Sequence, residues 1–229
     1  VYGSRSAVFN RHGALAQLRA VGQVHVRPLP EKMSFEEAAS LPVAALTALN
    51  GLRKCGVGKG THVLINGGTG GVGHFAVQIA RAREAIVTVT CSEANRDLAI
   101  SLGADEVMRY GSEELHACNN RFDAIMDAYG KMDLRLVRKL LKHGGTYAST
   151  LFIPPPYLSI ILTRLINGRR LTSANMRRHP EDWQVLEELY AEGRLRPLIE
   201  NIFPLERAAD AFDLAVNGKP RGKIIVTVP

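Results

Sequence analysis

Apolar and polar positions divide the chain into two kinds of segment, short runs rich in β-branched residues and longer stretches with helical spacing. The short runs predict strands over 62–66, 86–90, 106–109, 123–127, 146–150 and 171–175. The longer stretches predict helices over 71–83, 93–102, 133–141 and 180–191. Strands and helices that alternate in this way predict an α/β fold, with a parallel sheet covered on both faces.

The stretch before the first of these strands carries the signals of a helix start. Ser34 is a capping residue type, and acidic residues follow it in the first turn. Helical spacing continues over 38–52, although Pro42 is predicted to break or restart the helix because proline lacks a backbone N–H. A short strand is predicted earlier, over 24–27.

The last part of the chain departs from the regular alternation. After Pro197 the pattern predicts a strand over 199–203, a helix over 205–216 and a strand over 222–228. We interpret this tail as a return to a second, incomplete domain.

Composition narrows the protein class. The chain has 229 residues, of which 46% are hydrophobic and 22% charged, as in an ordinary globular protein. Its three cysteines form no C-x-x-C pair, which argues against a disulfide framework and indicates a reducing compartment, the cytoplasm by default. No run has the length of a transmembrane segment, and no signal peptide is visible. Because Val1 stands first, we interpret the chain as lacking a front part, which would have carried any organelle-targeting peptide.

The formal net charge of +7 favours anionic ligands. The basic residues are spread along the chain, and no nucleic-acid motif accompanies them. A solvated basic surface is therefore a better interpretation than a nucleic-acid site.

The most specific feature is a glycine-rich run between the strand over 62–66 and the helix after it. Three of its glycines have the G-x-G-x-x-G spacing. Such glycines let the backbone approach a diphosphate, while the helix N-terminus supplies N–H groups and partial positive charge. Because strand and helix flank the run, a dinucleotide site is favoured over a turn that only packs helix on strand. The residues expected at the nucleotide are Gly68, Thr69, Gly70, Gly71, Val72 and Gly73.

The end of the next strand indicates which dinucleotide binds. An Asp or Glu there selects NAD through the ribose 2′-hydroxyl, whereas polar or basic residues accommodate the 2′-phosphate of NADP. The strand ends without an acid, and Ser92, Asn95 and Arg96 follow. Glu93 is expected instead to begin a helix capped by Ser92, and a solvent-facing position is the alternative for Arg96. NADP (NADPH) is therefore predicted, with Tyr110 beside the adenosine unless it is only a packed aromatic.

Four motifs in order resemble those of the medium-chain dehydrogenase/reductase superfamily. They are the segment over 34–49, the glycines over 70–73, Leu102-Gly103-Ala104-Asp105, and the tail over 221–228. The most similar branch is the zinc-independent quinone oxidoreductase group, which resembles zeta-crystallin. The resemblance covers nearly the whole chain and implies a Rossmann-type doubly wound parallel sheet with parts of an incomplete GroES-like catalytic domain. By this comparison, 34–196 form the NAD(P)-binding domain, while 1–33 and 197–229 belong to the catalytic domain.

The resemblance adds three cofactor-binding residues. It implies that Thr47 lies near the nicotinamide, Ala128 where the nicotinamide ribose passes, and Lys223 near the cofactor cleft. A bond from the Thr47 hydroxyl to a helix carbonyl and a solvated Lys223 are the alternatives. Relatives usually carry a smaller residue in place of Tyr129, so its ring is expected either to narrow the nicotinamide channel or to point outward.

No metal site is expected. Zinc-dependent relatives carry a cysteine ligand near 41–43, where this chain has none, and its seven histidines show no ligand spacing. Each histidine is interpreted as a surface or loop residue. The resemblance implies NADPH-dependent hydride transfer to a quinone or an α,β-unsaturated carbonyl, with no catalytic side chain assigned in this chain. It also implies a homodimer through the sheet edge at 171–175, with the apolar segment over 152–166 at a partner surface, at the substrate entrance or in the core.

Two alternative functions have different signatures. A short-chain dehydrogenase needs a Tyr-x-x-x-Lys pair, and none of Tyr129, Tyr147 and Tyr157 has a lysine four residues later. A nucleotide-binding scaffold or regulatory protein without turnover stays open. Turnover of a panel of quinones and enals distinguishes the enzyme from the scaffold.

Overall fold

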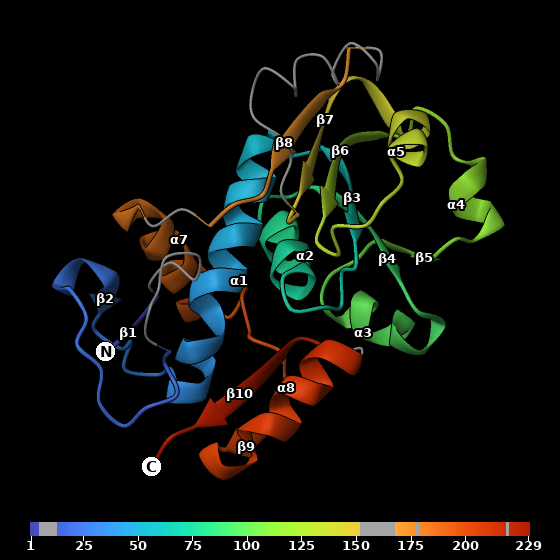
Figure 1. Cartoon of the computed structure of the whole chain (residues 1–229). Coiled ribbons are helices and arrows are strands. Elements are labelled where there is room, and N and C mark those ends of the chain that lie inside the picture. The colour runs from blue at the N-terminus through green and yellow to red at the C-terminus, as the bar shows by residue number, and fades with distance from the viewer. Residues whose placement is uncertain (5–12, 152–167, 177–178, 219) are drawn as a thin grey trace.

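A parallel sheet of six strands forms the centre of the protein (Figure 1). The computed structural model describes residues 1–4, 13–151, 168–176, 179–218 and 220–229. The strands are β3 (His62–Asn66), β4 (Ile86–Cys91), β5 (Glu106–Arg109), β6 (Phe122–Asp127), β7 (Leu141–Ser149) and β8 (Arg170–Ser173). Their order is β5-β4-β3-β6-β7-β8, which is the order 3-2-1-4-5-6 of a Rossmann-type sheet. The predicted fold class is therefore confirmed.

Helices cover both faces of this sheet, because the side chains of each strand alternate between two cores. The helices are α1 (Phe35–Lys54), α2 (Gly73–Ala82), α3 (Arg96–Ser101), α4 (Glu113–Ala117), α5 (Leu134–Leu140) and α7 (Pro180–Ala191). Val63 and Ile65 join a core with buried residues of α1, α2, α3 and α7, whereas Leu64 joins one with α4 and α5. The near-continuous apolar runs of the strands follow from this double burial.

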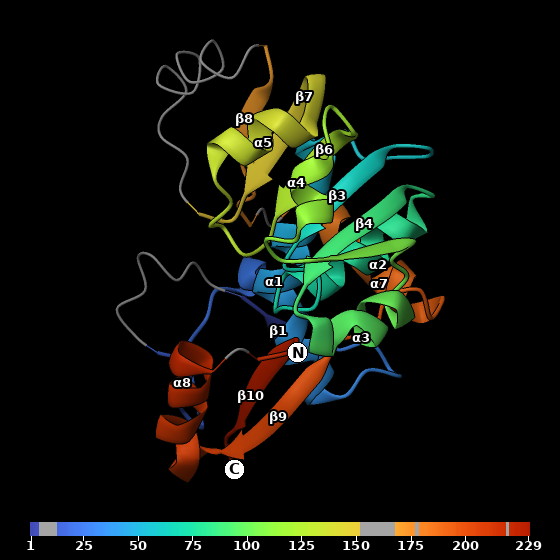
Figure 2. The same cartoon turned by 90° about the vertical axis from the view of Figure 1, so that its right-hand side faces the viewer.

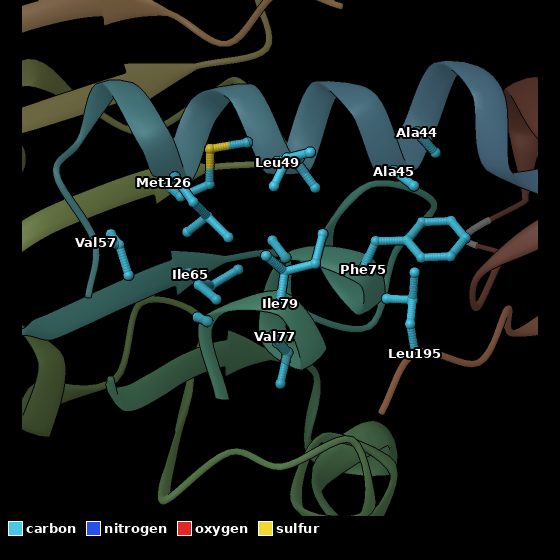
Figure 3. Packing of buried hydrophobic residues seen from close by; sticks show 14 of the residues in the cluster. Ala44, Ala45, Leu49, Val57, Ile65, Phe75, Val77, Ile79, Met126 and Leu195 are labelled. Carbon is cyan, nitrogen blue, oxygen red and sulfur yellow. The ribbon is translucent and has the colours of Figure 1, made fainter. Parts of the chain in front are cut away.

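The larger core is built on the contact between α1 and α2. Figure 3 shows Ala45 and Leu49 of α1 facing Phe75 and Ile79 of α2, with Ile65 of β3 beneath them. All five side chains are fully buried. Alanines on α1 let the two helices approach closely, so the glycine-rich run before α2 is held on a rigid base.

Helix α1 runs without interruption through Pro42, so the predicted break is wrong. Ser34 and Glu37 form a reciprocal capping box, with nitrogen–oxygen distances of 3.2 and 3.0 Å. Leu41, Leu46 and other residues of the helix are buried in the core. This burial offsets the cost of about 3 kcal/mol that an interior proline imposes.

Other boundaries also differ from those predicted. The single helix expected over 93–102 is a 3₁₀ turn η2 (Glu93–Asn95) followed by the shorter α3. Strand β7 begins at Leu141 rather than 146, directly after α5. Helix α4 was not predicted, because its five residues are too few to show helical periodicity. Segment 152–166 lies outside the described residues, and the expectation for it stays a prediction.

Two small sheets lie beside the central one (Figures 1 and 2). Near the N-terminus, β1 (Tyr2–Gly3) pairs antiparallel with β2 (Val26–Arg27), which follows a 3₁₀ turn η1 (Gln23–His25) where a longer strand was predicted. In the tail, β9 (Ile199–Pro204) pairs parallel with β10 (Lys223–Thr227). The 3₁₀ turn η3 (Leu205–Arg207) and α8 (Ala208–Asn217) connect them. Within the described residues, every helix is too short or too polar to cross a membrane.

Candidate functional site

The turn between β3 and α2 is too crowded for side chains at two positions. A Cβ atom added to Gly73 would lie 1.9 Å from the Gly67 carbonyl oxygen, and one added to Gly68 would lie 2.4 Å from Val89 Cγ1. Gly67 has a φ of +82°, a conformation that other residues rarely adopt. These three glycines are therefore required by the fold itself.

The middle of the same turn is open. The nearest atom to an added Cβ on Gly70 is the Gly67 carbonyl oxygen at 3.4 Å, an ordinary contact. Within the described residues, the backbone N–H groups of Gly71 and Val72 have no acceptor, as is usual just before a helix. Both residues are partly exposed. The turn thus offers unpaired N–H donors and a helix N-terminus, which fit a diphosphate.

The C-terminal tail is attached to this turn. The Gly222 N–H donates to the Thr69 carbonyl oxygen at 2.9 Å, and Lys223 Nζ lies 3.9 Å from where a Cβ on Gly71 would be. Lys223 is partly buried, and burial lowers the pKa of its ammonium group. No carboxylate pairs with it in the part of the chain that the structure describes. The tail therefore brings an uncompensated cation to the glycine turn from a distant part of the sequence.

The residues after β4 border the turn from the other side. Asn95 Nδ2 donates to Thr69 Oγ1 at 3.3 Å, which ties η2 to the glycine run. Ser92 and Glu93 are exposed; Glu93 begins η2 with Ser92 at its N-cap, as predicted, but the Ser92 side chain makes no capping hydrogen bond. Arg96 is exposed but donates from Nη1 to the Val107 carbonyl oxygen at 3.1 Å. Asn95 therefore links this group to the glycine turn by a side-chain hydrogen bond.

A buried polar network lies at the carboxyl ends of the central strands. Asn66 of β3 accepts from Thr90 Oγ1 at 2.6 Å and donates to Asp127 Oδ1 at 2.7 Å. Asp127 also accepts from the Tyr147 hydroxyl at 2.7 Å. Burial raises the pKa of this phenol, and the Asp127 carboxylate raises it further. The network joins four neighbouring strands at the edge where a dinucleotide crosses a Rossmann sheet.

Sequence patterns alone did not identify this network. Asn66 and Asp127 each end an apolar strand at its carboxyl terminus, and a polar residue in that position is the signal that was available. Ala128, a predicted cofactor residue, follows directly and donates its N–H to the Asn66 carbonyl oxygen at 3.0 Å. Tyr110, a second predicted cofactor residue, places its hydroxyl oxygen 3.3 Å from where a Cβ on Gly67 would be. Ala128 and Tyr110 therefore both lie at the carboxyl edge of the central sheet.

Thr47 is buried on α1, and its hydroxyl has no hydrogen-bond partner among the described residues. The alternative interpretation, a bond back to a helix carbonyl, is therefore not observed.

His74 corrects the interpretation of all histidines as surface or loop residues. It is fully buried in the first turn of α2, and its Nδ1 lies 2.9 Å from the Gly70 carbonyl oxygen. The pKa of His74 is lowered to about 4, chiefly by burial; the Gly70 carbonyl opposes this shift, and the Lys223 ammonium adds to it. Its Nε2 has no hydrogen-bond partner among the described residues. The neutral imidazole of His74 thus lies in the protein interior and contacts the Gly70 carbonyl oxygen of the glycine turn.

The residues described do not supply a zinc site. No three His, Cys, Asp or Glu side chains gather in one place within the described ranges. A catalytic zinc ion takes three protein ligands, so this part of the chain does not fit one.

Comparisons with known proteins agree with this geometry. The family model described as zinc-binding dehydrogenase matches residues 102–226. The chain is 30% identical over 225 residues to the chloroplast envelope quinone oxidoreductase homolog of Arabidopsis thaliana, covering 93% of this chain and 68% of that protein. It is 30% identical over 247 residues to the mitochondrial NAD(P)H oxidoreductase RTN4IP1 of Bos taurus, covering 95% of this chain and 62% of that protein.

Solved structures give the same result. The quinone oxidoreductase from Coxiella burnetii superposes with a TM-score of 0.82 at 33% identity, covering 90% of this chain and 65% of that one. The chain spans about half to two thirds of the length of its curated relatives, 52% of one and 68% of another. Family model, sequence relatives and structural neighbours agree over most of the chain. It therefore belongs to the medium-chain dehydrogenase/reductase superfamily, in the quinone oxidoreductase-like branch.

Proposed function

We propose that the protein binds NADP(H) along the carboxyl edge of the central sheet, with the diphosphate on Gly70, Gly71 and Val72. The observation that carries this proposal is the combination of unpaired N–H groups in an open glycine turn with the uncompensated Lys223 ammonium beside it. A diphosphate satisfies both at once, because it accepts hydrogen bonds and carries negative charge. Without an anion, the Lys223 ammonium would be partly desolvated with no attractive interaction to offset the cost.

NADP(H) is proposed over NAD(H) because of the residues near the tip of β4. Ser92 and Arg96 are exposed there, and Asn95 is bonded to Thr69. Glu93 is also exposed, but it lies in η2 rather than at the strand end where a ribose-binding acid stands. We assign Tyr110 to the adenosine side and Ala128 and Thr47 to the nicotinamide side, as the family resemblance implies.

The proposed activity is hydride transfer to a quinone or an α,β-unsaturated carbonyl without zinc. The bound reduced nicotinamide supplies the hydride. The residues of this chain bind and orient the nucleotide, and none is assigned as a proton donor. Relatives named as quinone oxidoreductases and as an NADPH-dependent alkenal/one oxidoreductase support this substrate class.

The wider organisation follows the same comparison. We propose that 34–196 act as the nucleotide-binding domain, that 1–33 and 197–229 belong to a catalytic domain, and that two copies associate through the edge strand β8. The cytoplasm is the proposed compartment, and an organelle is the alternative that chloroplast and mitochondrial relatives favour.

Alanine at Gly70 tests nucleotide binding without disturbing the fold. An added methyl group meets only an ordinary contact within the protein, but it occupies the space through which a diphosphate approaches the backbone. We expect Gly70→Ala to keep the wild-type melting temperature and to weaken NADPH binding at least about tenfold, measured by titration calorimetry. Gly58→Ala is the matched control, since an added Cβ there meets nothing within 4 Å. Equal NADPH affinity in the wild type and Gly70→Ala would contradict the proposal.

A further inference from the structure

The loop after β6 presents an aromatic side chain on an unusually well-fixed backbone. The N–H groups of Ala128 and Tyr129 both donate to the Asn66 carbonyl oxygen, at 3.0 and 3.2 Å. Those of Gly130 and Met132 donate to the Asp127 carboxylate, at 2.8 and 2.9 Å. Four of the five residues from 128 to 132 are thus held by the buried network. The position of Tyr129 is set by the sheet rather than by its own packing.

The Tyr129 side chain itself is 58% exposed. Its hydroxyl, like that of Tyr110, has no hydrogen-bond partner among the residues that the structure describes. The Lys131 ammonium lies over one face of the Tyr129 ring, 5.3 Å from the ring centre. An exposed aromatic ring on a rigid loop is typical of a surface that meets a ligand.

Tyr110 and Tyr129 meet each other at Gly67. Their ring centres are 6.3 Å apart, with 43° between the ring planes. A Cβ on Gly67 would lie 3.2 Å from Tyr129 Cβ and 3.3 Å from the Tyr110 hydroxyl oxygen. Tyr110 follows β5 and Tyr129 follows β6, so the two side chains meet beside the end of β3, which lies between β4 and β6.

This contact spans the path of a dinucleotide. A nucleotide on the glycine turn runs along the carboxyl edge from the β4 side to the β6 side. A centre-to-centre distance of 6.3 Å is that of two rings in direct contact, so no third group fits between them. The two rings therefore meet over the Gly67 backbone, on the expected path of the nucleotide.

We propose that Tyr129 closes the nucleotide site: its ring lies against Tyr110 at Gly67 and must separate from it when a dinucleotide binds. This inference rests on the proposed function, since it assumes that a dinucleotide occupies the site. Breaking a ring contact of this kind weakens binding about 2- to 12-fold. Because every dinucleotide must break the same ring contact, Tyr129 lowers the affinity of the site for all of them alike.

Stopped-flow measurement of NADPH binding, followed by nucleotide fluorescence, tests the closure. Tyr129→Ala should bind NADPH faster and about 2- to 12-fold more tightly than the wild type. Tyr129→Phe should behave like the wild type, because the contact involves the ring and not the hydroxyl. Phe212→Ala is the matched control, since it removes a ring that is 62% exposed on α8.

Three results would overturn the inference while leaving the proposed function intact. They are equal binding in the wild type and Tyr129→Ala, weaker binding in Tyr129→Ala, and a Tyr129→Phe variant that matches Tyr129→Ala. Absence of NADPH binding in every variant would instead contradict the proposed function, and the inference with it. Binding by Tyr129→Ala alone would support the closure and contradict NADPH binding by the wild type.

Discussion

Burial of His74 makes the stability of the protein depend on pH in a defined window. The pKa of His74 falls from 6.5 to about 4 in the folded chain, chiefly because burial disfavours the charged imidazole. The unfolded chain therefore binds more protons between these two values, and the free energy of unfolding falls as the pH drops through the window. The full effect is about 3 kcal/mol, of which about 2 kcal/mol is lost between pH 7 and pH 5.

His74→Gln isolates this contribution. Glutamine does not titrate, and its amide group has a donor for the Gly70 carbonyl oxygen that faces His74 Nδ1. Urea unfolding at pH 7, 6 and 5, followed by the fluorescence of the single tryptophan, Trp183, gives the free energies. We expect the wild type to lose about 2 kcal/mol more than His74→Gln between pH 7 and pH 5.

The exposed His143 provides the control for this experiment. His143→Gln should retain the wild-type pH dependence, because the histidine it removes is solvent-exposed. Parallel stability curves for the wild type and His74→Gln would refute the reasoning, since they would show that His74 titrates alike in the folded and unfolded chain.

Two further substitutions test the glycine turn and the polar network. Gly73→Ala should lower the free energy of unfolding by about 1–3 kcal/mol relative to Gly58→Ala, because the new methyl group meets backbone atoms that side-chain motion does not relieve. Equal urea midpoints would contradict this. Asp127→Ala should cost about 3 kcal/mol or more, since it leaves buried donors unsatisfied, while Asp127→Asn keeps one acceptor oxygen and should cost less. Calorimetric melting of both variants measures the difference, and similar losses in the two would show that the carboxylate is not required.

Local sequence patterns predicted an element correctly where the residues of that segment alone determine its secondary structure. The strands His62–Asn66 and Glu106–Arg109 and the helix Pro180–Ala191 were predicted with their observed bounds. Each is a run of one periodicity between residues that end it. The glycine spacing after β3 likewise identified a turn in which Gly73 has no room for a side chain.

Predictions were wrong where a distant part of the chain decides the outcome. Pro42 does not break α1, because the core on which the helix packs compensates for the missing hydrogen bond. His74 is buried rather than exposed, because α1, which precedes β3 in the chain, packs against α2. Neither effect is visible in a window of neighbouring residues, since the covering segments are remote in sequence.

The amino-acid sequence by itself determined the alternation of strands and helices, the glycine turn and the family, because each depends on residues that stand close together or in a fixed order. Only the tertiary structure decided which polar groups meet at the sheet edge. It brings Lys223 to Gly71, links Asn66 to Asp127 and closes Tyr129 against Tyr110. The physical reason is that parallel strands place their carboxyl ends side by side, so that side chains far apart along the chain come within contact distance.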